Sequence, residues 1–215
     1  MSGRAPLHHR ARAVLQDESG ATLVEFAVAI VAVLLIFLGT VDFGRMLFHQ
    51  VAAEKALHRA VRIAAVRPPA CANVPEVHER PDAPGTGTLP SYGTSCSAGS
   101  GVCKNAGTQI CTAAPGNATA EEVWALVRPT LPNTATISNL RFRYAFDPDL
   151  GFLGGPYVPN VTVELQDLNF TFVALLPQLT TLAVGADDAF AAGTVAFPAL
   201  GASVPGEDLA LGTDG

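Results

Sequence analysis

The sequence predicts an α+β fold, in which a long N-terminal transmembrane and stalk helix precedes a small antiparallel-sheet head with short helices. Two observations lead to this prediction. An apolar run early in the chain continues without proline into an amphipathic pattern. Several later segments alternate apolar and polar residues with a period of two, as half-buried strands do. A chain of 215 residues has room for one ordinary domain and a membrane element.

The apolar run spans residues 21–41 and predicts a membrane-spanning helix. Of its 21 residues, only Thr22, Glu25 and Thr40 are polar. At about 1.5 Å per residue, the run reaches about 30 Å, which is the thickness of a bilayer core. A buried core helix of this length and uniformity would be unusual, so a transmembrane segment is the preferred interpretation.

The pattern after the apolar run predicts an amphipathic stalk helix over residues 42–67. Alanines recur at every fourth position and have apolar neighbours, while charged residues fall on the opposite face. The apolar face holds Ala52, Ala53, Ala56, Leu57, Ala60, Val61, Ala64 and Ala65. Because no proline occurs between residues 21 and 67, we expect one continuous helix that ends before Pro68-Pro69.

The charges and cysteines predict the side of the membrane on which each part lies. Basic residues outnumber acidic ones on both flanks of the apolar run, so the positive-inside rule does not determine the orientation. From residue 68 onward, five basic residues stand against fourteen acidic ones, and all four cysteines lie there. We therefore expect a cytoplasmic N-terminus and an extracytoplasmic head. The acidity argues against a nucleic-acid partner.

Residues 1–20 form a hydrophilic leader whose end differs from a secretory signal. The small residues Ser19, Gly20 and Ala21 precede the apolar run, whereas a secretory cleavage site follows its apolar core. Cleavage here would leave the hydrophobic helix on the mature protein. The arrangement resembles a type IV prepilin, in which a cytoplasm-facing peptidase cuts just after a glycine. This resemblance implies a scissile bond between Gly20 and Ala21.

Glu25 is unusual because an ionised carboxylate near hydrocarbon needs a partner or an interfacial position. The prepilin resemblance makes it the fifth mature residue, whose carboxylate in pilins neutralises the new α-amino group of a neighbouring subunit. At an effective dielectric constant of about 20, such a pair is worth several kcal/mol. The alternative is an interfacial glutamate in the first turn of a membrane helix, where the helix dipole favours it.

The segment from Ser19 to Val66 contains a series of short motifs in a fixed order. They are Gly20, Val24-Glu25-Phe26, the apolar run, Asp42-Phe43-Gly44-Arg45 and the alanine-rich continuation over residues 52–65. This series resembles the TadE family, the pseudopilins that accompany Flp pili and the tight-adherence machinery. The resemblance covers about a quarter of the chain, and one departure is Ile30-Val31, where many relatives have a proline.

The TadE resemblance implies a minor pilin or pseudopilin in the bacterial cytoplasmic membrane. Its partners would be a prepilin peptidase, other pilins or pseudopilins and the pilus assembly machinery, with no small-molecule substrate. It would act by helix packing in Flp-type pilus assembly, through Glu25, Phe26, Asp42, Gly44 and Arg45. The competing hypothesis is an uncleaved single-pass signal-anchor protein whose extracytoplasmic disulfide-bonded domain binds a partner.

Residues 68–118 are rich in Gly, Pro, Ser and Ala and predict a loop region. Four cysteines in an exported loop imply two disulfides, with three possible connectivities. They are Cys71, Cys96, Cys103 and Cys111. A zinc site is the alternative, but the region has no Cys-x-x-Cys pair and only His78 is nearby.

Residues 119–200 predict an α+β head, followed by a flexible tail over residues 201–215. A capping box from Thr119 to Glu122 predicts a short helix over residues 119–127. Alternation predicts a strand at residues 140–146 and one or two more across residues 161–165 and 168–172, with a further candidate at 189–197. The inward aromatic residues of this pattern are predicted core residues, namely Phe142, Phe146, Phe170 and Phe172.

No catalytic motif is found, so the chain is expected not to be an enzyme. None of the five histidines has a serine or cysteine partner in a recognised nucleophile motif. Asp147 with Asp149, and Asp187-Asp188, lack the ligand spacing of an EF-hand. We expect no cofactor and no metal. A membrane-anchored hydrolase is a third hypothesis that the missing nucleophile motif disfavours.

Overall fold

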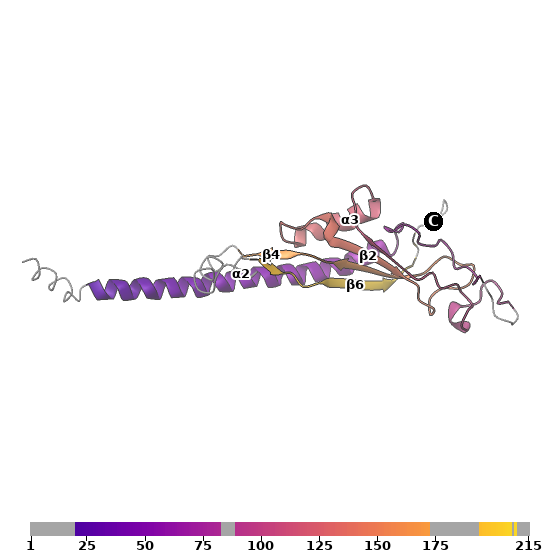
Figure 1. The fold of residues 1–215 in the computed structure, drawn as a ribbon, viewed down its shortest axis with the longest axis horizontal. Coiled ribbons are helices and arrows are strands. Elements are labelled where there is room, and N and C mark those ends of the chain that lie inside the picture. Colours follow the sequence, from indigo (N-terminus) through magenta and orange to yellow (C-terminus); the bar gives the residue numbers. More distant parts are fainter. Residues whose placement is uncertain (1–19, 83–88, 173–193, 208, 210–215) are drawn as a thin grey trace, which may run out of the picture. The chain divides into compact units, whose positions relative to one another are not determined.

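A computed structural model describes residues 20–82, 89–172, 194–207 and 209 of the chain (Figure 1). The chain divides into two compact units. One unit comprises residues 1–44 and 172–193, and the other comprises residues 45–171 and 194–215. The leader over residues 1–19 lies outside the described residues.

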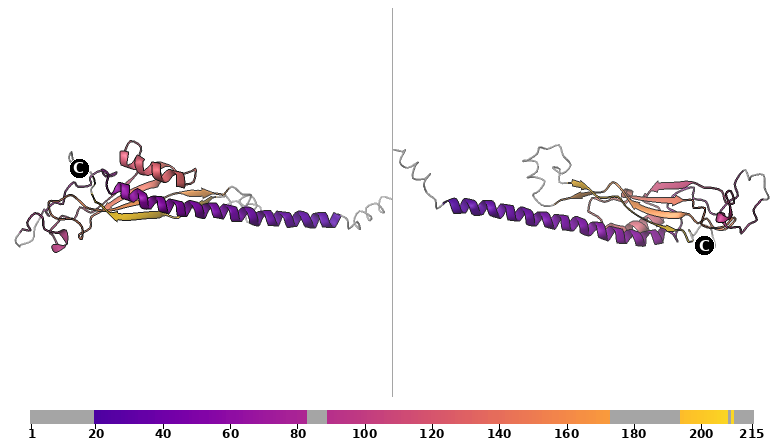
Figure 2. Two further views of the ribbon diagram at one scale, coloured as in Figure 1. Left: turned by 180° about the vertical axis from the view of Figure 1, so that it is seen from behind. Right: turned by 90° about the horizontal axis from the view of Figure 1, so that it is seen from below.

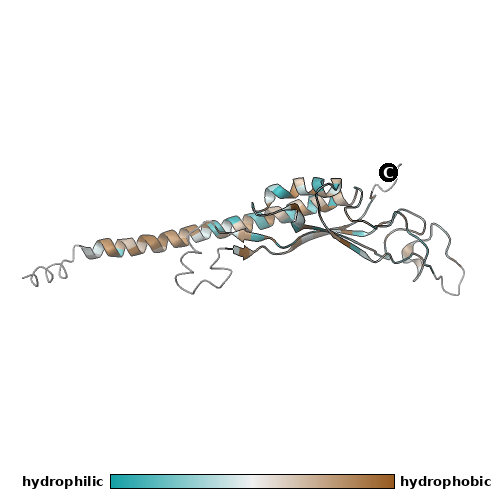
Figure 3. Cartoon of the chain, turned by 45° about the horizontal axis from the view of Figure 1, so that its top comes forward, coloured by the Kyte–Doolittle hydropathy of each residue, from teal (hydrophilic) through white to brown (hydrophobic). Residues whose placement is uncertain are grey.

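Helix α2 (Ala21–Ala64) is a single helix of 44 residues, as the proline-free sequence predicts. It ends shortly before Pro68-Pro69, which cannot continue it. Figure 3 shows that the first part of α2 is mostly hydrophobic, while its later part carries hydrophilic residues as well. Among the described residues, α2 is the one helix that is long and apolar enough to cross a membrane.

The head contains a four-stranded antiparallel sheet in the order β1-β2-β3-β6. Its strands are β1 (Thr108–Thr112), β2 (Leu140–Ala145), β3 (Asn160–Leu165) and β6 (Leu200–Pro205). In the central pair, Phe142 lies opposite Val163. A separate antiparallel pair consists of β4 (Asn169–Thr171) and β5 (Thr194–Ala196). The strand alternation in the sequence therefore predicted β2, β3 and β4.

One face of the four-stranded sheet is buried and forms the core of the head. Alternate residues of β2 and β3 point into it, namely Leu140, Phe142, Tyr144, Val161, Val163 and Leu165. The later part of α2 lies along this sheet (Figures 1 and 2). Of its predicted apolar stripe, seven residues are buried, and Ala52 is half-buried; the seven are Ala53, Ala56, Leu57, Ala60, Val61, Ala64 and Ala65. Small side chains allow this close approach.

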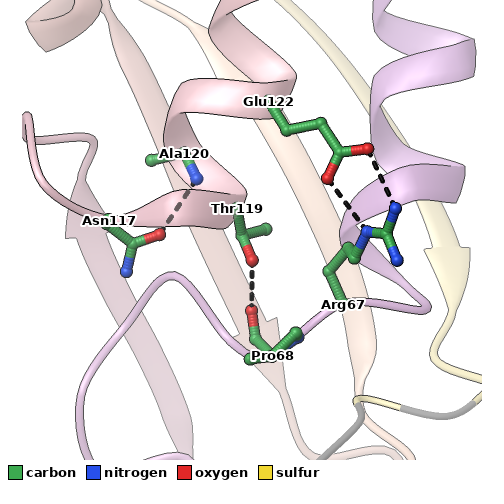
Figure 4. Close-up of polar contacts among 6 residues, drawn as sticks. All are labelled: Arg67, Pro68, Asn117, Thr119, Ala120 and Glu122. Carbon is green, nitrogen blue, oxygen red and sulfur yellow. Dashed lines mark hydrogen bonds and ion pairs between the residues drawn. The ribbon is translucent and has the colours of Figure 1, made fainter.

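Helix α3 (Ala118–Val127) begins one residue before its predicted start, and its cap differs from the prediction. The predicted capping box at Thr119 and Glu122 is wrong, because Asn117 is the N-cap residue. Its side chain accepts a hydrogen bond from the backbone N–H of Ala120 at 2.9 Å. Thr119 donates instead to the carbonyl oxygen of Pro68, as Figure 4 shows. An asparagine cap of this kind is worth about 1 kcal/mol.

The described part of the head also contains three one-turn 3-10 helices, at Cys96–Ala98, Arg128–Thr130 and Ile137–Asn139. Two strands were missed by the sequence analysis. Strand β1 lies in the predicted loop region, and β6, apart from Leu200, occupies residues of the predicted flexible tail. Of the candidate strand at residues 189–197, residues 194–196 form β5, while residues 189–193 lie outside the described part of the chain.

Candidate functional site: the apolar helix and the cysteine-bearing head

The predicted processing site lies at the first turn of α2. Gly20 is exposed and immediately precedes the helix, which begins at Ala21. Within the described residues, a Cβ atom added at Gly20 would meet nothing within 4 Å, and the backbone there has no positive φ that would favour glycine. The fold of the described residues therefore gives no steric reason for a glycine at this position.

Glu25 and Phe26 are exposed on the apolar part of α2. Phe26 is 66% exposed, like most of the large apolar side chains around it. Glu25 is the fifth residue of the helix, and the first turn contains no acidic residue. The stabilisation of an anion by the helix dipole falls off within the first turn, so it contributes little at Glu25.

The Asp-Phe-Gly-Arg element does not form one exposed surface. Asp42 is only 3% exposed, whereas the backbone at Gly44 is open. Phe43 packs against Phe172 with a ring-centroid distance of 5.4 Å. The guanidinium of Arg45 lies 5.8 Å from the ring centroid of Phe170, a cation–π distance. The predicted assembly role of these residues stays a prediction.

His49 connects α2 to the head, and sequence reasoning missed this role. Its Nδ1–H donates to the carbonyl oxygen of Thr130 at 2.8 Å. Its ring also contacts Phe170, with the ring centroids 6.0 Å apart. The partner is 81 residues away in the sequence, and no local pattern identifies such a contact.

The end of α2 is attached to the head through polar contacts (Figure 4). Arg67 donates to both carboxylate oxygens of Glu122, at 2.9 and 3.1 Å. These hydrogen bonds and the charge of Glu122 raise the pKa of Arg67, and the same hydrogen bonds lower the pKa of Glu122. Since both side chains are well exposed, the pair mainly fixes orientation.

A buried tyrosine provides a second attachment behind the helix end. The backbone N–H of Ala70 donates to the hydroxyl oxygen of Tyr144 at 3.0 Å. Tyr144 belongs to β2 and is fully buried, and burial raises its pKa to about 12. The hydroxyl therefore stays neutral and bonded at physiological pH.

The four cysteines form the two disulfides that the sequence predicts, and the structure selects one of the three connectivities. Cys71 pairs with Cys111, and Cys96 pairs with Cys103. The first bridge joins the segment after α2 to strand β1. The second closes a short loop and packs with Val102 and Leu153. Both bridges constrain a region that has few regular elements.

His78 lies in the interior of the head next to the second disulfide. Its side chain is 1% exposed and packs between the rings of Phe146 and Tyr157. The backbone N–H of Val158 donates to its Nε2 at 3.1 Å. A Cβ at Gly151, whose φ is +76°, would collide with this imidazole, so glycine is required there. Burial lowers the pKa of His78.

The lowered pKa of His78 predicts that the head loses stability in acid. Below its ordinary pKa of 6.5, the unfolded chain takes up a proton that the folded head does not bind. The contribution of His78 is therefore complete above pH 6.5 and decreases as the pH falls below it. We expect the urea midpoint of the full chain in detergent to fall between about pH 7.5 and pH 5.5.

Substitution of His78 separates this contribution from general acid effects. In His78→Gln the dependence of the midpoint on pH should be smaller, because the glutamine does not titrate. His58→Gln is the matched control, since His58 is exposed on α2 and should leave the dependence unchanged. An equal pH dependence in all three proteins would show that His78 does not contribute.

These features define an α+β protein whose head carries two disulfides and whose N-terminal helix suits a membrane anchor. Residues 20–62 match the family model described as TadE-like protein, which confirms the resemblance seen in the sequence. The match covers about a fifth of the chain. Comparison with curated proteins and with solved structures gives no significant match. The match and the helix together support a membrane-anchored protein related to Tad pilus assembly.

Proposed function

We propose that this chain is a TadE-like minor pilin or pseudopilin of Flp-type pilus assembly. It is anchored in the bacterial cytoplasmic membrane with its N-terminus in the cytoplasm and its disulfide-bonded head outside. A prepilin peptidase cuts between Gly20 and Ala21, and the mature helix packs with other pilins. The protein acts by association and not by catalysis.

The observation that carries this proposal is the position of the family match. It begins at Gly20, the last residue before α2, and follows the helix through residue 62. Cleavage after Gly20 would make Ala21 the first residue of both the helix and the mature chain. The described residues give no steric reason for glycine at position 20. Recognition by a peptidase would be a functional reason for it.

The exposure of α2 also favours association between helices. From Thr22 to Leu34 every side chain is exposed. In a membrane, lipid or neighbouring helices cover such a surface, and a carboxylate on it then needs a partner. Glu25 lies beyond the first turn, so the helix dipole does not account for it. The α-amino group created at Ala21 of a neighbouring subunit is the partner that the proposal assigns to it.

The competing function is an uncleaved signal-anchor protein with a partner-binding head. The helix and the disulfides suit it equally well. It leaves the family match at Gly20 and the position of Glu25 without a role, and so it ranks second.

Substitution of Glu25 tests the proposed role in assembly. Glu25→Gln should keep membrane insertion but reduce pilus output by at least about tenfold, since a lost ion pair of several kcal/mol weakens subunit docking. The measurement is the amount of pilin sheared from cells that lack the native copy and express the variant. Glu54→Gln is the control, because Glu54 is exposed on the same helix outside the apolar run. Wild-type pilus output from Glu25→Gln would exclude the charge-neutralisation mechanism.

A further inference from the structure

Two cysteine sulfurs and a histidine ring lie together inside the head. Among the described residues, the potential ligand atoms of His78, Cys96 and Cys103 all lie within 4.8 Å of one another. All three side chains are buried. This is the group that could hold a metal ion in the described part of the chain, and it does not involve the other cysteine pair.

The backbone holds two members of this cluster, His78 and Cys96, independently of the disulfide. His78 exchanges two hydrogen bonds with the segment at residues 154–155: its N–H donates to Gly155 at 2.9 Å, and its carbonyl accepts from Gly154 at 2.8 Å. The N–H of Cys96 donates to the carbonyl of Gly151 in the same segment, at 3.2 Å. Opening the S–S bond would therefore leave His78 and Cys96 attached to one segment.

One ring nitrogen of His78 has no hydrogen-bond partner in the part of the chain that the structure describes. Nε2 accepts the hydrogen bond from Val158, whereas Nδ1 is buried without a hydrogen-bond partner among the described residues. Buried polar atoms in folded proteins are almost always paired, so an exception calls for an explanation. A metal ion that binds Nδ1 when the neighbouring disulfide is reduced would be such an explanation.

The ligand set matches zinc. Thiolate sulfur binds zinc at about 2.3 Å and imidazole nitrogen at about 2.0–2.1 Å, so two ligands of one ion lie at most about 4.6 Å apart. The histidine nitrogen needs only a small adjustment to come within this spacing of the sulfurs. The two sulfurs, 2.01 Å apart in the disulfide, move apart once the bond is reduced. We propose that the reduced head binds one zinc ion through Cys96, Cys103 and Nδ1 of His78, with water in the fourth position.

Binding requires the disulfide to be open. A dithiol reductant supplies two electrons: its own two thiols become a disulfide, and Cys96 and Cys103 each become a thiol. Zinc then displaces one proton from each thiol. The ring proton moves from Nδ1 to Nε2, so the hydrogen bond from Val158 is lost when zinc binds. Zinc binding and disulfide formation therefore exclude each other at this site.

Zinc titration of the full chain in detergent tests this proposal. A trialkylphosphine, which becomes the phosphine oxide with oxygen from water, reduces the protein without chelating zinc. The reduced wild type should bind one zinc ion, and the oxidised wild type should bind none. Reduced Cys96→Ser/Cys103→Ser and reduced His78→Gln should each bind zinc at least about tenfold more weakly.

The second cysteine pair supplies the internal control. In reduced Cys96→Ser/Cys103→Ser, the thiols of Cys71 and Cys111 remain. The zinc affinity of this variant is therefore the affinity of a cysteine pair without a histidine ligand. X-ray absorption on the zinc-loaded wild type needs no variant to fold, and it should show two sulfur ligands and one imidazole. Absence of imidazole, absence of zinc from the reduced wild type, or equal affinity in the serine variant would overturn the proposal.

Discussion

Replacement of Cys71 and Cys111 by serine is expected to lower the free energy of unfolding of the head by about 4 kcal/mol. The two residues are 40 positions apart, so their bridge removes a large conformational freedom from the unfolded chain. The bridge also joins the segment after α2 to β1, whose Cys111 lies opposite Phe142 in the central strand β2. Loss of the bridge therefore weakens the contact between the helix end and the sheet.

The other disulfide provides the comparison. Cys96 and Cys103 are 7 residues apart, so Cys96→Ser/Cys103→Ser should cost only about 2.5 kcal/mol by the same loop-entropy relation. Urea unfolding of the full chain in detergent measures both, with the fluorescence of the single tryptophan, Trp124 in α3, as the probe. An equal or larger loss from the short loop would contradict the assignment of the stabilising role to the Cys71–Cys111 bridge.

The substitution Phe142→Ala is expected to destabilise the head by about 3–5 kcal/mol, the usual range for a fully buried phenylalanine. Phe142 is 0% exposed and lies in β2, between β1 and β3. The paired strands β1 and β3 hold the walls of the resulting cavity apart, so relaxation should recover little of the loss.

Arg143→Ala is the matched control for Phe142→Ala. Arg143 is the next residue of the same strand, and its side chain is exposed on the opposite face. It should change stability by less than about 0.5 kcal/mol. If the two substitutions had similar effects in urea unfolding, the assignment of the buried face would be wrong.

The elements that local patterns encode could be predicted from the sequence. Helix α2 follows from an apolar run and a stripe without proline, and β2 and β3 follow from strict alternation. In the two missed strands this alternation is weak, because few of their apolar residues are large. The only large apolar side chain of β1 is Ile110, which is half exposed, and β6 contains Gly201 and Pro205. Pairing with β2 and β3 makes them strands, and this pairing is a tertiary effect.

The cap of α3 and the cysteine pairs show the same limit at the level of single residues. Asn117 and Thr119 are both good capping residues, and the contact of Thr119 with Pro68 decides between them. The connectivity of four cysteines depends on which segments the fold brings together, and spacing does not determine it. The position of His78 beside the second pair depends in the same way on the segment at residues 151–155.

The two disulfides of the candidate site could be predicted, whereas the processing and assembly roles of the residues on α2 stay predictions. Gly20, Glu25 and the apolar run are defined by their order along one helix, and the family match begins at the first of them. The burial of Asp42 could not be predicted, because its surroundings depend on the tertiary fold. The proposed partner of the Glu25 carboxylate belongs to a neighbouring subunit. The sequence or fold of one chain therefore does not determine the role of Glu25.

The central claim is that Ala21 is the first residue of the mature protein. Mass spectrometry of the N-terminal peptide tests it, with the protein expressed once with its native prepilin peptidase and once without it. We expect a peptide that begins at Ala21 only when the peptidase is present, and this new N-terminus would give Glu25 its partner amine. A peptide that begins at residue 1 or 2 under both conditions would show that Gly20 is not a processing site and would leave a signal-anchored protein.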